Sequence, residues 1–212
     1  MNKIKYIAIA LIAIAGLGFQ QAKADIYSFD LTNGNSAISG FPGPYANVQV
    51  STSGPNATTA TITFTAYSGF LIGAAQAADV NVNKTGTSWS IGSFSWTGGN
   101  ANTNFTDSGA GNADGFGSFN QTTKNFDGFT SAVSMVSFVL TNIGGSWANA
   151  LSVLTANLSG WLAAAHIFVI ADQTVLTGFA AGPSVPDGGT TVMLLGMALG
   201  ALGVARRYCL KS

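Results

Sequence analysis

The chain has 212 residues, of which 47% are hydrophobic and only 8% are charged, and this length suggests a single domain between its two ends. Cytosolic enzymes usually carry about three times that share of charged residues. Between positions 25 and 184, two lysines stand against seven aspartates and no glutamate, so this segment has a net charge of −5 and no basic face for nucleic acid. The single cysteine, Cys209, excludes an intramolecular disulfide.

The N-terminal end has the three parts of a secretory signal peptide. These parts are the basic residues Lys3 and Lys5, the apolar run 7–18, and the small residues Ala22 and Ala24 of a cleavage site. The apolar run is shorter than the ~20 residues with which a helix crosses a bilayer. We predict that residues 1–24 are a signal peptide and that signal peptidase cleaves before Asp25; the alternative is a buried N-terminal helix.

Residues 25–184, here called the body, contain several runs in which apolar and polar residues alternate. Three such runs begin at Tyr27, Ala60 and Val136. Alternation with period two is typical of half-buried strands. In a fourth run, residues 89–96, the alternation changes phase beside Gly92, which predicts a β-bulge. Because clusters of Gly, Asn, Ser and Thr separate the runs at short intervals, we predict an all-β body, an antiparallel, jelly-roll-like β-sandwich.

Residues 106–117 form the segment most suited to a cation. Asp107, Asn112 and Asp114 offer oxygen ligands to Ca²⁺, together with backbone carbonyls. Their spacing is not that of an EF-hand, and segments rich in Asn, Asp and Gly are also common because they turn well. The segment is therefore predicted to be a loop, with Ca²⁺ as the one cofactor that the sequence suggests.

Residues 161–170 are apolar on both faces, which fits a central strand or a short buried helix; the β-branched and aromatic residues in the run favour the strand. His166, the only histidine, shares a strand face with Ala164 and Phe168. A histidine in this setting is more typical of a packed core residue than of a catalyst. Without a second histidine for zinc, a GxSxG motif or a marked carboxylate pair, the body is predicted to have no catalytic activity.

The C-terminal end combines a turn, an apolar run and two basic residues. In chain order these are Val185, Pro186, Asp187, Gly188 and Gly189, then the apolar or small residues 190–205, then Arg206 and Arg207. The proline, aspartate and glycines favour an extended turn over continued helix. The apolar run approaches the length of a membrane span, and the arginines would hold that end in the cytoplasm. We predict a C-terminal transmembrane helix with the body outside.

This three-part end resembles the PEP-CTERM sorting signal and is most similar to its VPDSG-CTERM variant. Val185, Pro186, Asp187 and Gly189 match the variant's motif, and Gly188 stands in place of its serine. The resemblance covers residues 185–212. It implies that an exosortase, a membrane protease or transpeptidase, cuts near the motif and releases or transfers the body. The alternative for this end is an ordinary single-span anchor.

Two functions from different classes are compatible with these features. The first is a non-catalytic protein of the cell surface or extracellular matrix, made as a membrane-anchored precursor, sorted by an exosortase and associated with exopolysaccharide. The second is a carbohydrate-binding module that holds a glycan with the Ca²⁺ loop and with the tryptophans Trp89, Trp96, Trp147 and Trp161. Exposed, coplanar tryptophan rings beside the acidic segment would favour the second function, and four buried tryptophans would favour the first.

Overall fold

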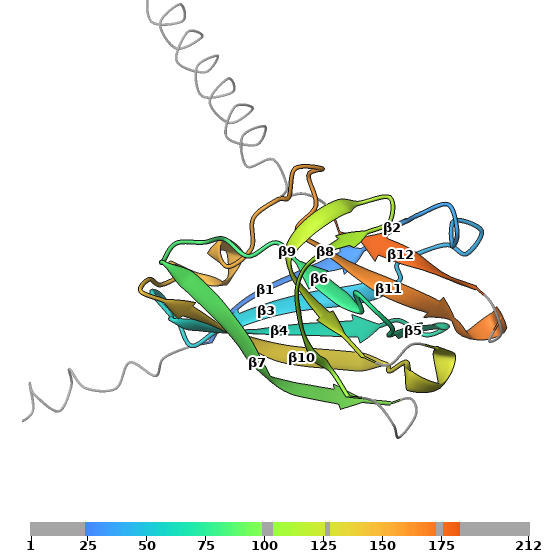
Figure 1. The fold of residues 1–212 in the computed structure, drawn as a ribbon, viewed down its shortest axis with the longest axis horizontal. Coiled ribbons are helices and arrows are strands. Elements are labelled where there is room, and N and C mark those ends of the chain that lie inside the picture. Colours follow the sequence, from blue (N-terminus) through green and yellow to red (C-terminus); the bar gives the residue numbers. More distant parts are fainter. Residues whose placement is uncertain (1–23, 99–103, 126–127, 173–175, 183–212) are drawn as a thin grey trace, which may run out of the picture.

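The computed structural model describes residues 24–98, 104–125, 128–172 and 176–182 (Figure 1). These residues form antiparallel β-sheets and short 3₁₀ helices, so the predicted all-β, antiparallel body is confirmed. The predicted signal peptide, apart from Ala24, and the predicted C-terminal transmembrane helix lie outside the described residues. Within the described ranges, no helix is long and apolar enough to cross a membrane.

Two antiparallel sheets make up the body. The first has the order β1 (Asp25–Leu31), β3 (Ala46–Thr52), β4 (Thr59–Ala66), β10 (Met135–Ile143) and β7 (Ser88–Thr97). The second has the order β2 (Asn33–Gly34), β12 (Thr177–Ala181), β11 (Ala163–Val169), β6 (Ala78–Val80), β9 (Gly117–Lys124) and β8 (Thr106–Ala113), with β5 (Phe70–Ile72) paired to β11. The 3₁₀ helices are η1 (Phe129–Ser131), η2 (Ala150–Ser152) and η3 (Ile170–Asp172). Strands distant in sequence, such as β4 and β10, therefore lie side by side.

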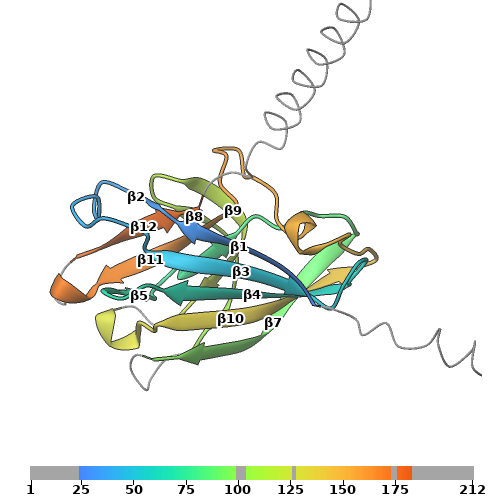
Figure 2. The ribbon, with the colours of Figure 1, turned by 180° about the vertical axis from the view of Figure 1, so that it is seen from behind.

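The two sheets share one hydrophobic core. Ile62 and Phe64 enter this core from β4, and Val80 and Ile167 enter it from β6 and β11, all at 0% exposure. Figure 1 shows β11 and β12 in front of β1 and β3, and Figure 2, seen from behind, shows β1 and β3 in front. Because successive strand residues point to opposite faces, the period-two runs of the sequence are the strands whose inner face lines this core.

Strand β7 contains the bulge that the sequence predicts beside Gly92. Ser95 pairs with Ser137 of β10 and Gly92 pairs with Val139, so three steps along β7 match two along β10. Ser93 has a φ of 51°, in the left-handed region of the backbone. An extra residue at this point returns the apolar side chains that follow it to the core face of the sheet.

Strand β11 lies in the middle of the second sheet, so the strand predicted for residues 161–170 is confirmed over the helix. It pairs with β12 on one side and with β5 and β6 on the other. Every residue of β11 except His166 is buried. The run is apolar on both faces because other parts of the body pack against both faces of the sheet at β11.

The β8–β9 hairpin supplies the cover on the second face. Phe116 and Phe119 form a second, smaller hydrophobic cluster with Ala164 of β11. Ala163 and Ala165 point into the main core, so Ala164 points to the opposite face, where the hairpin packs. Strand β6, which lies between β9 and β11, is consequently enclosed from both sides of the sheet.

Candidate functional site

The body begins and ends next to the two predicted processing sites. Strand β1 begins at Asp25, the residue predicted to follow signal peptidase cleavage, and Ala24 before it is exposed. At the other end β12 stops at Ala181, and the Gly182 N–H donates a hydrogen bond of 3.0 Å to the carbonyl of Ala163. The predicted processing residues Ala22, Val185, Pro186, Asp187, Gly188, Gly189, Arg206 and Arg207 lie outside the described residues.

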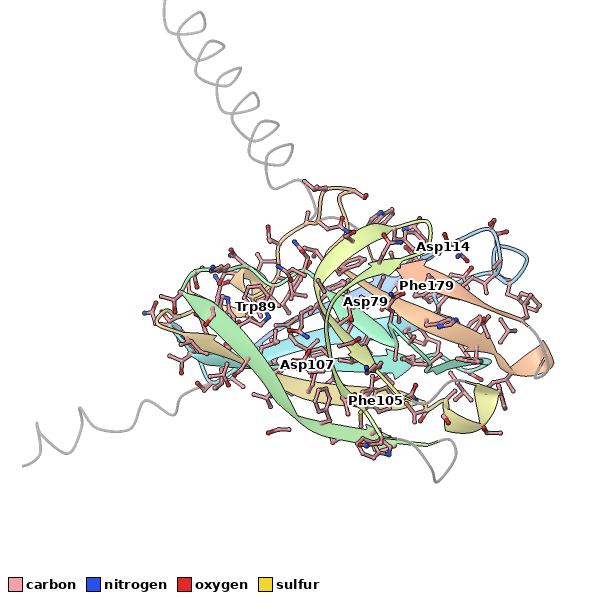
Figure 3. All side chains as sticks on the ribbon, in the orientation of Figure 1. Asp79, Trp89, Phe105, Asp107, Asp114 and Phe179 are labelled. Carbon is pink, nitrogen blue, oxygen red and sulfur yellow. The ribbon has the colours of Figure 1, made fainter. Side chains whose placement is uncertain are left out.

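The segment predicted to be a calcium loop is a β-hairpin. Asp107 and Asn112 lie on β8, and Asp114 lies in the turn before β9. At about 3.3 Å per strand residue, Asp107 and Asn112 are roughly 16 Å apart. Figure 3 shows Asp107 and Asp114 well apart. The loop prediction is wrong because the glycines of this segment, such as Gly109, lie at register shifts of a strand.

The geometry of the hairpin does not bring the three predicted calcium ligands together at one point. Among the residues that the structure describes, no group of three or more His, Cys, Asp or Glu side chains could hold a metal ion. The site that sequence spacing suggested is therefore spread along one strand and its turn.

The acidic side chains of the hairpin accept hydrogen bonds from amide side chains of the body. The Asp107 carboxylate accepts a hydrogen bond of 2.8 Å from Gln121 Nε2, and Gln121 Oε1 accepts one of 3.0 Å from Trp89 Nε1. This chain of bonds joins β8 and β9 of the second sheet to β7 of the first. Asp114 accepts a bond of 3.2 Å from Asn35 Nδ2, which ties the hairpin turn to the segment after β2.

Asp79 on β6 is a buried carboxyl group that no sequence motif marks. It is 0% exposed, and its register neighbours are Thr122 on β9 and Ala164 on β11, on the face that the hairpin covers. Among the described residues, neither carboxylate oxygen of Asp79 nor the Thr122 hydroxyl has a hydrogen-bond partner. A Cβ on Gly111 of β8 would lie 2.8 Å from Thr122 Cγ2, so glycine permits this close cover.

Burial raises the pKa of the Asp79 carboxyl well above its usual range. A carboxyl group taken out of water without a charged partner favours its neutral form. The sequence signal for Asp79 was its position, as the only charged residue of the segment GFLIGAAQAADV, residues 69–80, which apart from Gln76 is otherwise apolar or small.

All four tryptophans contact other residues of the body. Their contacts are Gln121 for Trp89, Phe105 for Trp96, Asn83 for Trp147 and Phe116 for Trp161. Trp147 is 0% exposed, Trp89 and Trp161 are half-buried, and Trp96 is 37% exposed. The rings form neither an exposed, coplanar row beside the acidic segment nor a wholly buried set.

His166 lies in an aromatic group on the outer face of the second sheet. Its ring stacks with Phe179 at a centroid distance of 4.6 Å and with Phe168 at 5.3 Å. Its Nδ1 lies 3.3 Å from the carbonyl oxygen of Ala75. The prediction that His166 shares a strand face with Phe168 is confirmed. The His166 ring packs against the outer face of the sheet beside Phe179, which is labelled in Figure 3.

A surface hollow beside the exposed Leu158 is lined by Asn81, Asn120 and Asn157, among others. The Asn120 amide bonds both the N–H and the carbonyl of Val82, at 2.7 and 2.9 Å. Asn157 donates to two carbonyls of the hairpin and accepts from two backbone N–H groups of its own loop. These two side-chain amides therefore connect neighbouring backbone segments around the hollow.

Comparison with known proteins bears on the C-terminal end alone. Residues 184–207 match the family model described as the VPDSG-CTERM motif. No curated protein and no solved structure matches the chain. The match supports a PEP-CTERM-like sorting tag, and such a tag indicates export, a surface location and processing by an exosortase. The chain therefore ends in a sequence similar to the tags of exosortase-sorted surface proteins.

Proposed function

We propose that the chain is the precursor of an exported, non-catalytic protein of the cell surface or extracellular matrix. Signal peptidase removes residues 1–24, a C-terminal span holds the precursor in the membrane, and an exosortase cuts near residues 185–189. The body is a jelly-roll-like β-sandwich that associates with exopolysaccharide after processing.

The observation that carries this proposal is the position of the folded body between the two processing sites. Asp25 begins β1, Gly182 follows the last strand, and the match to the sorting motif begins at residue 184. Cleavage at either site would remove no strand of the described body. A sorting tag that directly follows the folded body could be removed without disrupting that body, as expected for an exported protein.

The outer face of the first sheet supports association with a polysaccharide. On β4, Thr59, Thr61, Thr63 and Thr65 alternate with core residues and therefore point away from the core. Gln49 on the adjacent strand β3 is exposed. Hydroxyl and amide groups can both donate and accept hydrogen bonds, which suits the many hydroxyls of a glycan.

The contacts of the acidic side chains support a structural role for them. Asp30 accepts hydrogen bonds from Asn47 Nδ2 at 2.7 Å and from the Tyr67 hydroxyl at 2.9 Å. Asp107 bonds Gln121, which accepts a bond from Trp89 of β7, and Asp114 ties the hairpin turn to Asn35. These carboxylates contribute to the cohesion of the body, which agrees with a protein that acts through its surface.

The intact mass of the mature protein, purified from cells that produce it, tests the proposed processing. We expect a chain that begins at Asp25 and ends between residues 184 and 190. A mature chain that still contains Cys209 and Lys211 would show a plain membrane anchor and contradict the proposal.

Co-sedimentation of the mature protein with the exopolysaccharide of the same cells tests the proposed association. Thr61→Val and Thr65→Val together remove two hydroxyls from the outer face and keep the side-chain shape. We expect weaker co-sedimentation at an unchanged melting temperature. Equal binding by the variant and the wild type would exclude this face of β4.

A further inference from the structure

The two sheets end in strands of very different character. β2 has two residues, β1 carries Asp25 and Asp30, and β8 carries Asp107 and contains two register shifts. β7 is ten residues long, with the sequence SWSIGSFSWT, and it pairs with β10 alone among the described strands. β7 is therefore the one strand at a described sheet end that is long and carries no charge.

An edge strand presents a row of backbone N–H and carbonyl groups that can pair with another strand. Proteins usually block such edges with charges, prolines, short strands or bulges. β7 has no charged residue and no proline, and its one irregularity lies at Ser93, beside Gly92. From Ser95 to Thr97 the strand keeps regular pairing with β10. The C-terminal half of β7 is thus the least protected stretch of edge in the described sheets.

The side chains of this half also leave an aromatic ring partly uncovered. Phe94 packs on Phe138 of the core, at a centroid distance of 6.2 Å. Trp96 lies 5.7 Å from Phe105 and remains 37% exposed at the border of the body. Between them, Ser95 is exposed on the opposite face of the sheet.

We propose that β7 pairs in antiparallel orientation with β7 of a second copy of this chain, about a two-fold axis at Ser95. In this register Ser95 lies opposite Ser95, and Phe94 lies opposite Trp96 of the second copy. An aromatic pair thereby covers the exposed ring, and the two first sheets become one continuous sheet. No charge on either β7 opposes the contact, and a two-fold axis makes this single patch complementary to itself.

Among the long strands at the sheet ends, β7 is best suited to pair with its own copy because it carries no charge. Pairing β1 with itself would bring Asp25 and Asp30 of two copies together, and like charges across a strand pair are unfavourable. β7 paired with itself brings together only serine, glycine and apolar residues. The inference goes beyond the proposed function and does not depend on the sorting tag.

Cysteine cross-linking in the full chain tests the pairing, with Cys209→Ser as the background so that each variant has one thiol. Directly opposed residues of antiparallel strands lie about 4.5–5.5 Å apart between Cα atoms, within the range for a disulfide. Ser95→Cys should therefore form a disulfide-linked dimer on a non-reducing gel after mild oxidation. We expect at least ten times more dimer than for the two controls below.

The controls are matched in exposure. Ser90→Cys lies on the same strand and the same outer face, but a pairing centred on Ser95 separates the two thiols of this variant by about 33 Å. Gln49→Cys is exposed on β3, inside the sheet. Preferential dimer from Ser90→Cys, equal dimer from all three variants, or no dimer from Ser95→Cys would each overturn the proposal.

A second variant measures the same contact without a disulfide. Ser95→Lys brings two positive charges together at the axis, so the detergent-solubilised full chain should sediment as a monomer where the wild type sediments as a dimer. Gln49→Lys adds the same charge away from the edge and should leave the dimer intact. A monomeric wild type, or a dimer that Ser95→Lys does not weaken, would contradict the proposed pairing.

Discussion

The Asp25 carboxylate accepts a hydrogen bond of 2.6 Å from the backbone N–H of Ala150. Asp25 is the first residue of β1, and Ala150 is the first residue of η2, 125 positions later in the chain. The side chain of Asn149 caps the same short helix. The residue that becomes the N-terminus under the proposed processing is therefore fixed to a distant part of the sequence.

Asp25→Ala should lower the free energy of unfolding of the mature protein by about 0.5–2 kcal/mol, the usual cost of losing a side-chain cap. The Ala150 N–H loses its acceptor, while the rest of β1 keeps its pairing with β3. Asp25→Asn retains an acceptor oxygen and should lose clearly less. Urea unfolding of the two variants measures the difference, and equal stability of Asp25→Ala and wild type would show that the bond contributes nothing.

Gln121 connects Trp89 of the first sheet to Asp107 of the second, and it is 5% exposed. Gln121→Leu keeps the size of the side chain but leaves the Trp89 N–H without its acceptor, which should cost about 1–3 kcal/mol of unfolding free energy. Gln49→Leu, at an exposed position, serves as the control and should cost little. A loss of the same size for both variants would argue against the bridge.

Much of the body was predictable because its strands have one buried face. The residues of β4 alternate as a half-buried strand requires, and the phase change beside Gly92 correctly marked the bulge of β7. The apolar run of β11 was identified from its β-rich composition despite lacking a period. In these elements the local pattern and the tertiary environment agree.

The β8–β9 hairpin was not predictable in the same way. β8 has the sequence TDSGAGNA, with no apolar alternation and with glycines that usually signal turns. Its strand conformation comes from pairing with β9, so tertiary context overrides local preference. The burial of Asp79 depends on this hairpin, and for that reason the local sequence could not indicate it. The three predicted calcium ligands lie on this hairpin.

The buried Asp79 should make the stability of the body depend on pH. Its folded-state pKa is raised above that of an unfolded carboxyl, so the folded state holds the proton more tightly. Its stabilising contribution is fully present below the ordinary carboxyl pKa and is lost as pH rises through the raised value. Asp79→Asn cannot ionise and should be more stable than wild type at neutral and alkaline pH.

Urea unfolding of wild type and Asp79→Asn across a pH range of about 4–9, which spans the ordinary and the raised pKa, measures this effect. The difference between the two should grow with pH. Asp107→Asn is the control because Asp107 is exposed. A constant difference between wild type and Asp79→Asn over the whole range would show that Asp79 does not titrate with folding.

Calcium should leave the melting temperature of the mature protein unchanged. A ligand that binds the folded state alone raises the melting temperature by mass action. Asp107, Asn112 and Asp114 are spread along β8 and its turn, so this arrangement does not bring them together around one point. Thermal unfolding with millimolar Ca²⁺ and with a chelator measures the shift. A rise that Asp114→Ala abolishes would show that the hairpin rearranges around the ion.

We expect two parts of the C-terminal tag to have different roles, one in membrane insertion and one in recognition by the processing enzyme. Arg206 and Arg207 each cost about 2.5–3.5 kcal/mol at a bilayer centre, so they should stop the short apolar run from passing through the membrane. Replacing both with Ala should yield an uncut precursor that is no longer held in the membrane. Pro186→Ala with Asp187→Ala should instead yield an uncut precursor that is correctly inserted, because the span and its arginines are intact. Membrane fractionation and the intact mass of each variant distinguish these outcomes, and normal processing of the Pro186 and Asp187 variant would show that the motif is not what the processing enzyme recognises.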